Sequence, residues 1–128
     1  MNTADLATAV ELARGAVGVD AQTPATAVAV RRLDRDAEYA LVHLGRTGAA
    51  GWIAAVNVAD SDVMSWAVNP SGESTVPALG PAERGTATEY VWRPSAVSRS
   101  PLYPLLRLET DAGERFVDLS GRSFTELP

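Results

Sequence analysis

With 128 residues, 46% of them hydrophobic and 21% charged, the chain is long enough for one soluble globular domain with a buried core, and its composition excludes intrinsic disorder. The formal net charge of −5 disfavours nucleic acid and anionic membranes as partners, because both are negatively charged, and no apolar run is long enough to cross a membrane. Cysteine is absent, which excludes thiolate nucleophiles and disulfides. All eleven basic residues are arginine, which excludes lysine Schiff bases and is typical of a GC-rich bacterial genome.

Residues 3–17 are predicted to form an amphipathic helix. Apolar side chains recur at helical spacing along one face, at Leu6, Val10, Ala13 and Val17. Thr3 is the expected N-cap, and Gly15 and Gly18 supply the expected stop at the other end. Because the apolar face is rich in alanine, we expect the helix to approach its packing partner closely, and a sheet is the natural partner.

Four strands are predicted to follow the helix as an antiparallel meander. They span residues 26–33, 38–44, 52–58 and 63–68 and are separated by short segments rich in Asp, Gly and Ser. The third of them, WIAAVNV, is almost continuously apolar, which is typical of a central strand buried on both faces. Trp52, at its start, is therefore expected to be buried.

The second half of the chain is predicted to contain further strands after a bridge rich in proline and glycine. The bridge covers residues 69–81, and the strands cover 86–93, 105–110, 114–119 and 123–127. Asp111, Ala112 and Gly113 join two of these strands in a predicted hairpin. One helix followed only by strands predicts the α+β class, with one N-terminal helix packed on a curled antiparallel sheet of about seven or eight strands. We interpret residues 1–128 as a single domain, which can divide at the bridge into 1–68 and 82–128.

The first half of the chain carries three segments, within residues 3–66, that resemble a known family. They are ATAVELARGAVG, AVAVRRLDRDAEYALVHLG and GWIAAVNVADSDVMSW, and together they resemble a PepSY-type module. The third strand of such modules ends in an Asp-x-x-x-Gly turn, whereas Asp60 here is followed by Ser61, Asp62 and Val63, without glycine. The resemblance implies a helix before a short antiparallel sheet, and a mostly extracytoplasmic protein that binds or inhibits a partner instead of performing catalysis.

The side chains on which catalysis usually depends are few. His43 is the only histidine and shares a strand face with Tyr39 and Leu41, where a structural role is the more common one. No Gly-x-Ser-x-Gly elbow, P-loop or Gly-x-Gly-x-x-Gly motif is present. Two carboxylate clusters fall where turns are predicted, at Asp34, Asp36, Glu38, Asp60 and Asp62. We therefore assign no catalytic residue, no metal site and no cofactor.

The segment 92–104, WRPSAVSRSPLYP, is the most unusual part of the sequence and allows two interpretations. In the first, the segment binds an anion or an acidic segment through arginine guanidinium groups, serine hydroxyls and a wall of aromatic side chains. The prolines lower the entropy cost of ordering this site. The residues of this site are Trp92, Arg93, Ser95, Ser98, Arg99 and Tyr103. In the second, the segment is a stiff connection between strands, and its arginines pair with the chain's own carboxylates.

We expect a small soluble binding module without catalytic activity, which acts through a protein partner or through self-association along a sheet edge, as in a homodimer. Bacterial inhibitors, immunity proteins and accessory proteins fit this description, and a structural role in a larger assembly is a related hypothesis. The N-terminal segment carries acidic residues where a signal peptide carries basic ones, which favours a cytoplasmic location. The alternative is a small enzyme or ligand-binding protein with a pocket between sheet and helix, lined by His43, Trp52, Trp66, Tyr90 and Trp92.

Overall fold

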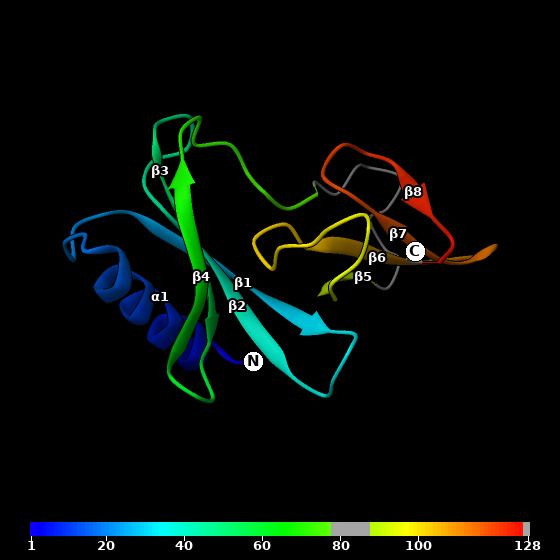
Figure 1. Cartoon of the computed structure of the whole chain (residues 1–128), viewed down its shortest axis with the longest axis horizontal. Coiled ribbons are helices and arrows are strands. Elements are labelled where there is room, and N and C mark those ends of the chain that lie inside the picture. Colours follow the sequence, from blue (N-terminus) through cyan, green and yellow to red (C-terminus); the bar gives the residue numbers. More distant parts are fainter. Residues whose placement is uncertain (78–87, 127–128) are drawn as a thin grey trace. The chain divides into compact units, whose positions relative to one another are not determined.

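The computed structural model of the chain describes residues 1–77 and 88–126 and confirms the α+β fold (Figure 1). Within these residues one helix, α1 (Thr3–Val17), precedes eight strands. The strands are β1 (Ala25–Arg32), β2 (Glu38–Leu44), β3 (Gly51–Asn57), β4 (Asp62–Asn69), β5 (Thr88–Trp92), β6 (Leu105–Thr110), β7 (Gly113–Val117) and β8 (Ser123–Phe124). Hydrogen-bonded neighbours follow the order β4-β3-β2-β1-β5-β6-β7-β8, so the sheet is open.

The strands lie close to the segments that the sequence predicts. The predicted strands 38–44 and 105–110 are confirmed without change. The predicted terminal strand 123–127 is too long, because β8 ends at Phe124 and residues 125 and 126 are not in a strand; residue 127 lies outside the described residues. Parts of the predicted bridge 69–81 and of the predicted strand 86–93 lie outside the described residues.

The chain divides into two compact units, which are described separately. The helix unit contains residues 1–29 and 38–74, and the loop unit contains residues 30–37 and 75–128. The sequence predicts a subdivision at the bridge, which leaves 30–37 with the first group. This segment belongs to the loop unit because the last residues of β1 pair with β5.

Helix α1 begins with a capping box. The Asn2 side-chain oxygen accepts the backbone N–H of Asp5 at 2.9 Å, and the Asp5 carboxylate accepts the backbone N–H of Asn2 at 3.2 Å. The prediction of Thr3 as the N-cap is therefore wrong by one position, since Thr3 is already the first helical residue. Gly18 ends the helix with a φ of 87°, and its N–H donates to a carbonyl of the last turn at 2.8 Å. Gly15 lies inside the helix.

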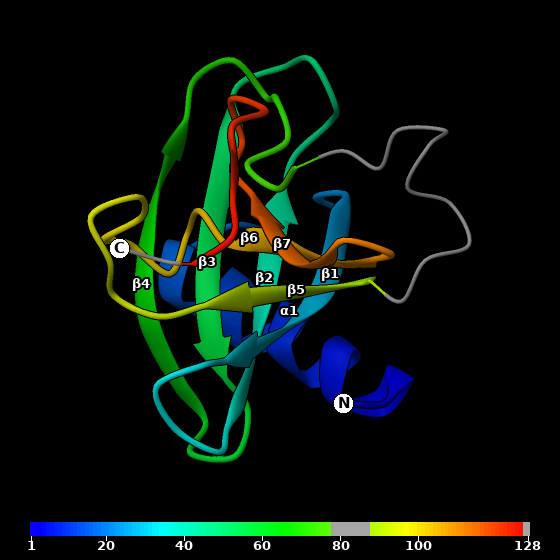
Figure 2. The same cartoon turned by 90° about the vertical axis from the view of Figure 1, so that its right-hand side faces the viewer.

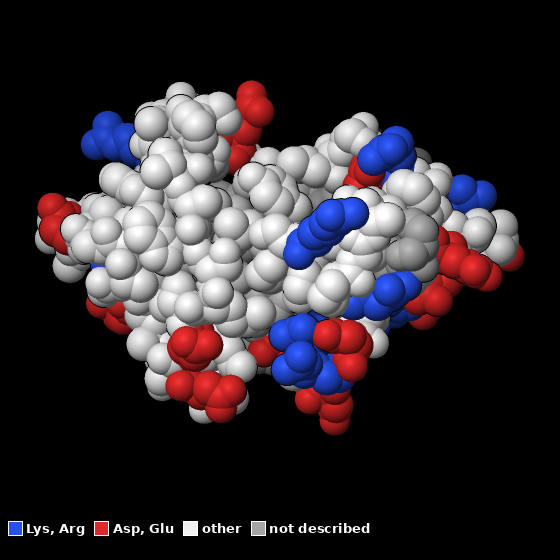
Figure 3. All heavy atoms as spheres, in the orientation of Figure 1, with Lys and Arg blue, Asp and Glu red and all other residues white. Residues whose placement is uncertain are grey.

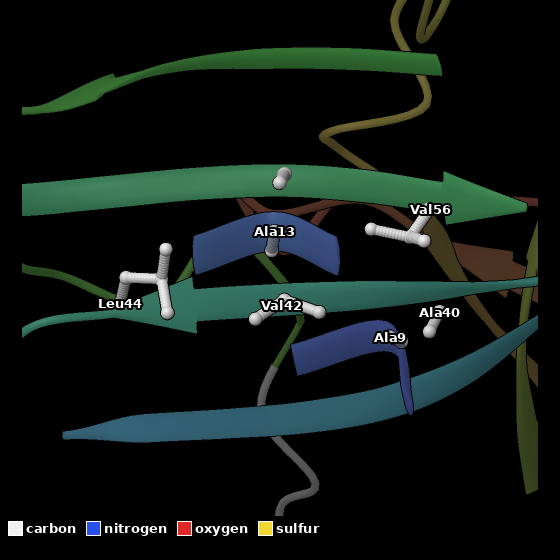
Figure 4. Packing of buried hydrophobic residues seen from close by; sticks show 7 residues of the cluster. Ala9, Ala13, Ala40, Val42, Leu44 and Val56 are labelled. Carbon is white, nitrogen blue, oxygen red and sulfur yellow. The ribbon is translucent and has the colours of Figure 1, made fainter. Parts of the chain in front are cut away.

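The core of the helix unit forms where α1 packs on one face of β2 and β3 (Figure 4). Ala9 and Ala13 of the helix are fully buried, and their short side chains allow the close approach that the sequence predicts. They pack against side chains that alternate along the two paired strands, namely Ala40, Val42, Leu44, Ala54 and Val56. Figure 2 shows β2, β3 and β4 side by side, with α1 behind them.

The sheet of the helix unit ends at β4, which pairs with β3 through a bulge between Ala55 and Val56. Trp52, at the start of β3, is only partly buried, which corrects the expectation of burial. The reason lies in its neighbour. Trp52 is opposite Val68 of the edge strand β4, and Val68 is itself exposed, so one side of the indole is left open.

The loop unit contains a parallel strand pair that the sequence does not predict. Val30 of β1 pairs with Tyr90 of β5 in parallel, whereas β5, β6, β7 and β8 pair with one another in antiparallel fashion. A parallel pair joins segments that are distant along the chain, and local sequence patterns carry little information about such pairs. The core of this unit contains Val91, Leu105 and Phe116.

Ion pairs connect neighbouring strands on the same face of this sheet as the core. Glu89 of β5 accepts a forked contact from Arg31 of β1 and a hydrogen bond from Arg107 of β6 at 2.8 Å. Arg107 also contacts the carboxylates of Glu109 and Glu114, at 3.1 and 3.2 Å. The hydrogen bonds, above all that from Arg31, lower the pKa of Glu89 from 4.5 to about 2. These charges satisfy one another and stabilise the pairing of the strands.

Candidate functional site

The predicted binding segment, loop 92–104, consists of two consecutive turns that its own serines hold together. In the first turn the Ser95 N–H donates to the Ser98 carbonyl at 3.1 Å, and the Ser98 N–H donates to Ser95 Oγ at 3.2 Å. In the second turn the Tyr103 N–H donates to the Ser100 carbonyl at 3.1 Å. The Ser98 hydroxyl joins both turns, because it donates to the Tyr103 carbonyl at 2.6 Å. Leu102 is buried and anchors the loop to the unit.

Three of the six predicted site residues take part in the fold of the loop unit itself. Ser95 and Ser98 are buried, and their hydroxyls bond within the loop. Trp92 is also buried, and the guanidinium of Arg32 lies over its ring, 5.2 Å from the centroid. The sequence suggests that Trp92 and Tyr103 form an aromatic wall at the surface. This is wrong, because Trp92 is buried.

The remaining predicted site residues reach the surface. The Tyr103 side chain is 45% exposed. Arg99 is exposed and forms no ion pair with any residue that the structure describes. Arg93 is partly buried, and its guanidinium donates to the Pro94 carbonyl at 3.4 Å. Of the six predicted site residues, Arg99 and Tyr103 are thus the two that are exposed to solvent.

A hollow of about 230 Å³, the Tyr103 hollow, lies between loop 92–104 and the turn at residues 118–122. Its lining includes Tyr103 and Leu119, and the latter is 47% exposed. Val97, Ser98, Leu105, Asp118 and Arg122 complete most of the remaining wall. The sequence places Leu119 at the end of a strand, but β7 ends at Val117 and leaves Leu119 in the turn. The only signal for Leu119 is a large apolar side chain between polar neighbours.

A buried carboxylate fixes the turn at 118–122. Asp118 accepts the Ser120 hydroxyl at 2.7 Å, the Arg122 backbone N–H at 2.9 Å and Arg122 Nε at 3.0 Å. Burial alone raises the pKa of Asp118, but these hydrogen bonds outweigh burial and leave the pKa below its ordinary 3.8. The carboxylate is therefore charged at neutral pH, and it holds the second wall of the hollow in place.

A second hollow, the His43 pocket, has a volume of about 140 Å³ and lies in the helix unit beside the turn that joins β2 to β3. It brings His43 and Trp52 together, as the alternative hypothesis expects, whereas Trp66, Tyr90 and Trp92 are not in its lining. No residue of α1 lines it. The pocket therefore lies at the turn end of the sheet and not between the sheet and the helix.

Two glycines give the His43 pocket backbone walls. A Cβ added at Gly51 would lie 2.2 Å from the Leu44 carbonyl oxygen, and one at Gly72 would lie 2.1 Å from the Ala49 carbonyl oxygen. Gly72 also has a φ of +66°, a conformation that favours glycine. The turn after β4 can approach the turn after β2 this closely only because Gly72 lacks a side chain, and the start of β3 can lie this close to the end of β2 only because Gly51 lacks one.

The chemistry of the His43 pocket comes from hydrogen-bond donors. Burial lowers the pKa of His43 from 6.5, so the imidazole is neutral at pH 7. The other polar groups of the lining are hydroxyls, an amide and a guanidinium, from Thr26, Thr47, Ser74, Asn69 and Arg46. Among the described residues of the lining there is no carboxylate. These described groups are suited to binding a ligand through hydrogen bonds and a guanidinium.

The edge strand β4 carries apolar side chains at the surface. Trp66 is 45% exposed and Val68 is 60% exposed. Among the described strands only β3 pairs with β4, which leaves one row of backbone groups unpaired within that part of the chain. Figure 3 shows a broad uncharged surface over β4, with acidic side chains at the end where the strand begins.

Comparison with known proteins gives no relative. No family model matches the chain, and no curated protein or solved structure matches it. The resemblance to PepSY-type modules therefore stays a prediction. Across residues 1–77 and 88–126, no helix has the length and apolar character needed to span a bilayer. In the same part of the chain, no three His, Asp or Glu side chains form a group that can hold a metal ion.

Proposed function

We propose that this chain is a non-enzymatic binding module that recognises a protein partner through loop 92–104 and the turn at 118–122. The observation that carries the proposal is the Tyr103 hollow, in which two exposed apolar side chains flank a space of about 230 Å³. Aromatic side chains at the centre of a shaped surface supply much of the binding energy in protein interfaces. An inhibitor, immunity protein or accessory protein needs a surface of this kind.

The rigidity of both walls supports the proposal. Serine hydrogen bonds and the prolines at 94, 101 and 104 restrict loop 92–104, and Asp118 restricts the facing turn. Binding usually costs about 0.5–1.5 kcal/mol for each side chain that must be immobilised. A surface that is ordered before binding avoids part of this cost.

The charge of the surface indicates the chemistry of the partner. Loop 92–104 contains two arginines and no acidic residue, whereas Arg122 and Asp118 in the lining of the hollow pair with each other. We therefore propose a partner segment in which an apolar side chain stands next to Asp or Glu. The apolar side chain enters the hollow, and the carboxylate pairs with Arg99. The net charge of −5 supports a protein and not a nucleic acid as the partner. The cytoplasmic location expected from the sequence stays a prediction.

Site-directed cross-linking tests the proposal. A photoreactive amino acid is placed at position 103 or 119 of the full chain, and the cross-linked partner segment is identified by mass spectrometry. A synthetic peptide of that segment is then titrated against the unmodified protein. We expect it to bind, and we expect Tyr103→Ala and Leu119→Ala each to weaken binding roughly tenfold or more, the effect of a central interface residue. Arg99→Gln should weaken binding and reduce its dependence on salt.

Matched variants in the helix unit serve as controls. A photoreactive residue at position 66 and the variant Trp66→Ala alter another exposed aromatic residue, far along the chain from loop 92–104. The peptide should bind Trp66→Ala as tightly as it binds the unmodified protein. Equal capture of the same segment from positions 103 and 66 contradicts the proposal, and so does a captured segment without an acidic residue.

The edge strand favours self-association as a second candidate function. β4 combines an unpaired backbone row, within the described strands, with the exposed side chains of Trp66 and Val68. Asp62, at its first position, is its only charged residue, whereas exposed edges are usually protected by several charges or prolines. A second copy supplies an identical strand, and two such strands can pair in antiparallel fashion about a two-fold axis.

A further inference from the structure

The His43 pocket takes no part in the partner surface proposed above, and its size limits what it can hold. Its volume of about 140 Å³ is close to that of a cavity of about 150 Å³ that admits benzene. A ligand of about six non-hydrogen atoms therefore fills it. Peptide side chains with a backbone attached, nucleotides and sugars are larger than this.

The guanidinium of Arg46 gives the pocket an anion-binding group, although carboxylates outnumber arginines in the helix unit as a whole. The helix unit contains seven carboxylates, at Asp5, Glu11, Asp20, Glu38, Asp60, Asp62 and Glu73, and only two arginines, Arg14 and Arg46. Arg14 is bound to Glu11 at 2.8 Å and to the Thr23 carbonyl at 2.7 Å. Arg46 lines the pocket and forms no ion pair with any residue of the described chain. Among the described residues, Arg46 is thus the arginine of the helix unit without an ion pair, and it is also the charged side chain of the pocket lining.

The lining has a polar and an apolar part. Thr26, Thr47 and Ser74 carry hydroxyls, whereas Leu44, Ala49 and Trp52 are apolar. An inorganic oxyanion such as phosphate uses only the polar part. A carboxylate with a short hydrocarbon tail uses both, because the tail leaves water when the carboxylate pairs.

We propose that the His43 pocket binds a short-chain monocarboxylate of about six non-hydrogen atoms, with the carboxylate paired to Arg46. Glu73 follows Gly72 in sequence, but its side chain is not part of the lining, so no carboxylate of the described residues opposes the ligand there. The backbone walls at Gly51 and Gly72 hold the shape of the pocket, since neither wall can accept a side chain. The neutral imidazole of His43 adds a hydrogen-bonding group to the lining without a second charge.

The protein contains its own reporter for this proposal. Because His43 is the only histidine, the imidazole Cε1–H gives a single NMR signal that needs no assignment. Sodium butyrate is titrated into the full chain at pH 7, with sodium chloride replaced to keep the ionic strength constant. We expect a saturable shift of the His43 signal. Sodium phosphate, added in a parallel titration, should cause a smaller shift or none.

Two variants test the role assigned to Arg46. Arg46→Gln removes an exposed guanidinium without an ion pair, so the fold should be retained, and butyrate should bind roughly tenfold more weakly or worse. Arg99→Gln makes the same change of charge in the loop unit and should leave butyrate binding unchanged. Thr47→Ala removes one hydroxyl of the lining and provides an independent variant, for which we expect a smaller loss.

The outcomes separate this proposal from partner binding. A His43 signal that does not shift with butyrate, or that shifts equally in Arg46→Gln, overturns the pocket proposal. Tighter binding of phosphate than of butyrate overturns the monocarboxylate as the ligand. The partner peptide of the loop unit should bind Arg46→Gln normally, so failure of one proposal leaves the other standing.

Discussion

Glu89 accepts hydrogen bonds from Arg31 and Arg107, and its pKa lies at about 2 instead of 4.5. Because the folded pKa is below the unfolded one, the ion pairs stabilise the fold above about pH 4.5, and this contribution disappears as the pH falls toward 2. We expect Glu89→Gln to lower the free energy of unfolding at pH 7 by about 1 kcal/mol or less, since the pairs are partly exposed and screened by solvent. Urea unfolding followed by tryptophan fluorescence measures this difference.

The pH dependence distinguishes the ion pairs of Glu89 from a general loss of packing. The difference between Glu89→Gln and the unmodified protein should shrink as the pH approaches 2. Glu109→Gln is the matched control, because that carboxylate is more exposed and, among the described residues, pairs with Arg107 alone. Its effect should stay within about 0.5 kcal/mol at any pH. An equal loss for Glu89→Gln at pH 7 and at pH 2 contradicts the electrostatic explanation.

At the scale of secondary-structure elements, the start of α1 tests the capping box. We expect Asn2→Ala to destabilise the protein by about 1 kcal/mol, because the substitution leaves the Asp5 N–H without its side-chain acceptor. Thr3→Ala is the control, since Thr3 lies inside the helix and its replacement should cost less. Thermal unfolding followed by circular dichroism gives both values. A larger effect at Thr3 than at Asn2 contradicts the assignment.

Loop 92–104 shows how far an element can be predicted from its sequence. The prolines and serines indicate a restrained connection, and the structure has one. The sequence does not show that Ser95 and Ser98 form hydrogen bonds within the loop, because a serine hydroxyl can stabilise a turn or bind a ligand equally well. The position of Leu119 in the Tyr103 hollow could not be predicted either, because it depends on where β7 ends.

At the scale of the whole molecule, the β4 edge predicts self-association. We expect the unmodified protein to dimerise with rising concentration, as measured by size-exclusion chromatography with light scattering. Val68→Lys should shift it to monomer, because a charge on a paired edge strand is costly. Tyr103→Lys makes a similar change on the loop unit and should leave the dimer intact. A protein that stays monomeric at every concentration contradicts this second candidate function.

The fold class and most strand positions could be predicted because apolar runs and turn residues are local features of the sequence. The strand 38–44 is a mostly apolar run between clear turn signals, and both of its ends are confirmed. Pairing across the chain could not be predicted, as Val30 and Tyr90 show. The residues of the candidate sites were the hardest to predict, because the exposure of a side chain depends on its neighbours in the fold. Trp52 and Trp92 have the same side chain, yet Trp52 borders an open pocket and Trp92 is buried under Arg32.

The division of β1 between the two units has a consequence for how the chain acquires its structure. The helix unit draws only on the first 74 residues, and most of its pairings join neighbouring strands. The last residues of β1 must wait for β5, since Val30 pairs with Tyr90 sixty positions later. Closing so long a segment is slower than forming a hairpin. During synthesis on the ribosome, the helix unit can therefore be complete while the end of β1 is still an unpaired edge.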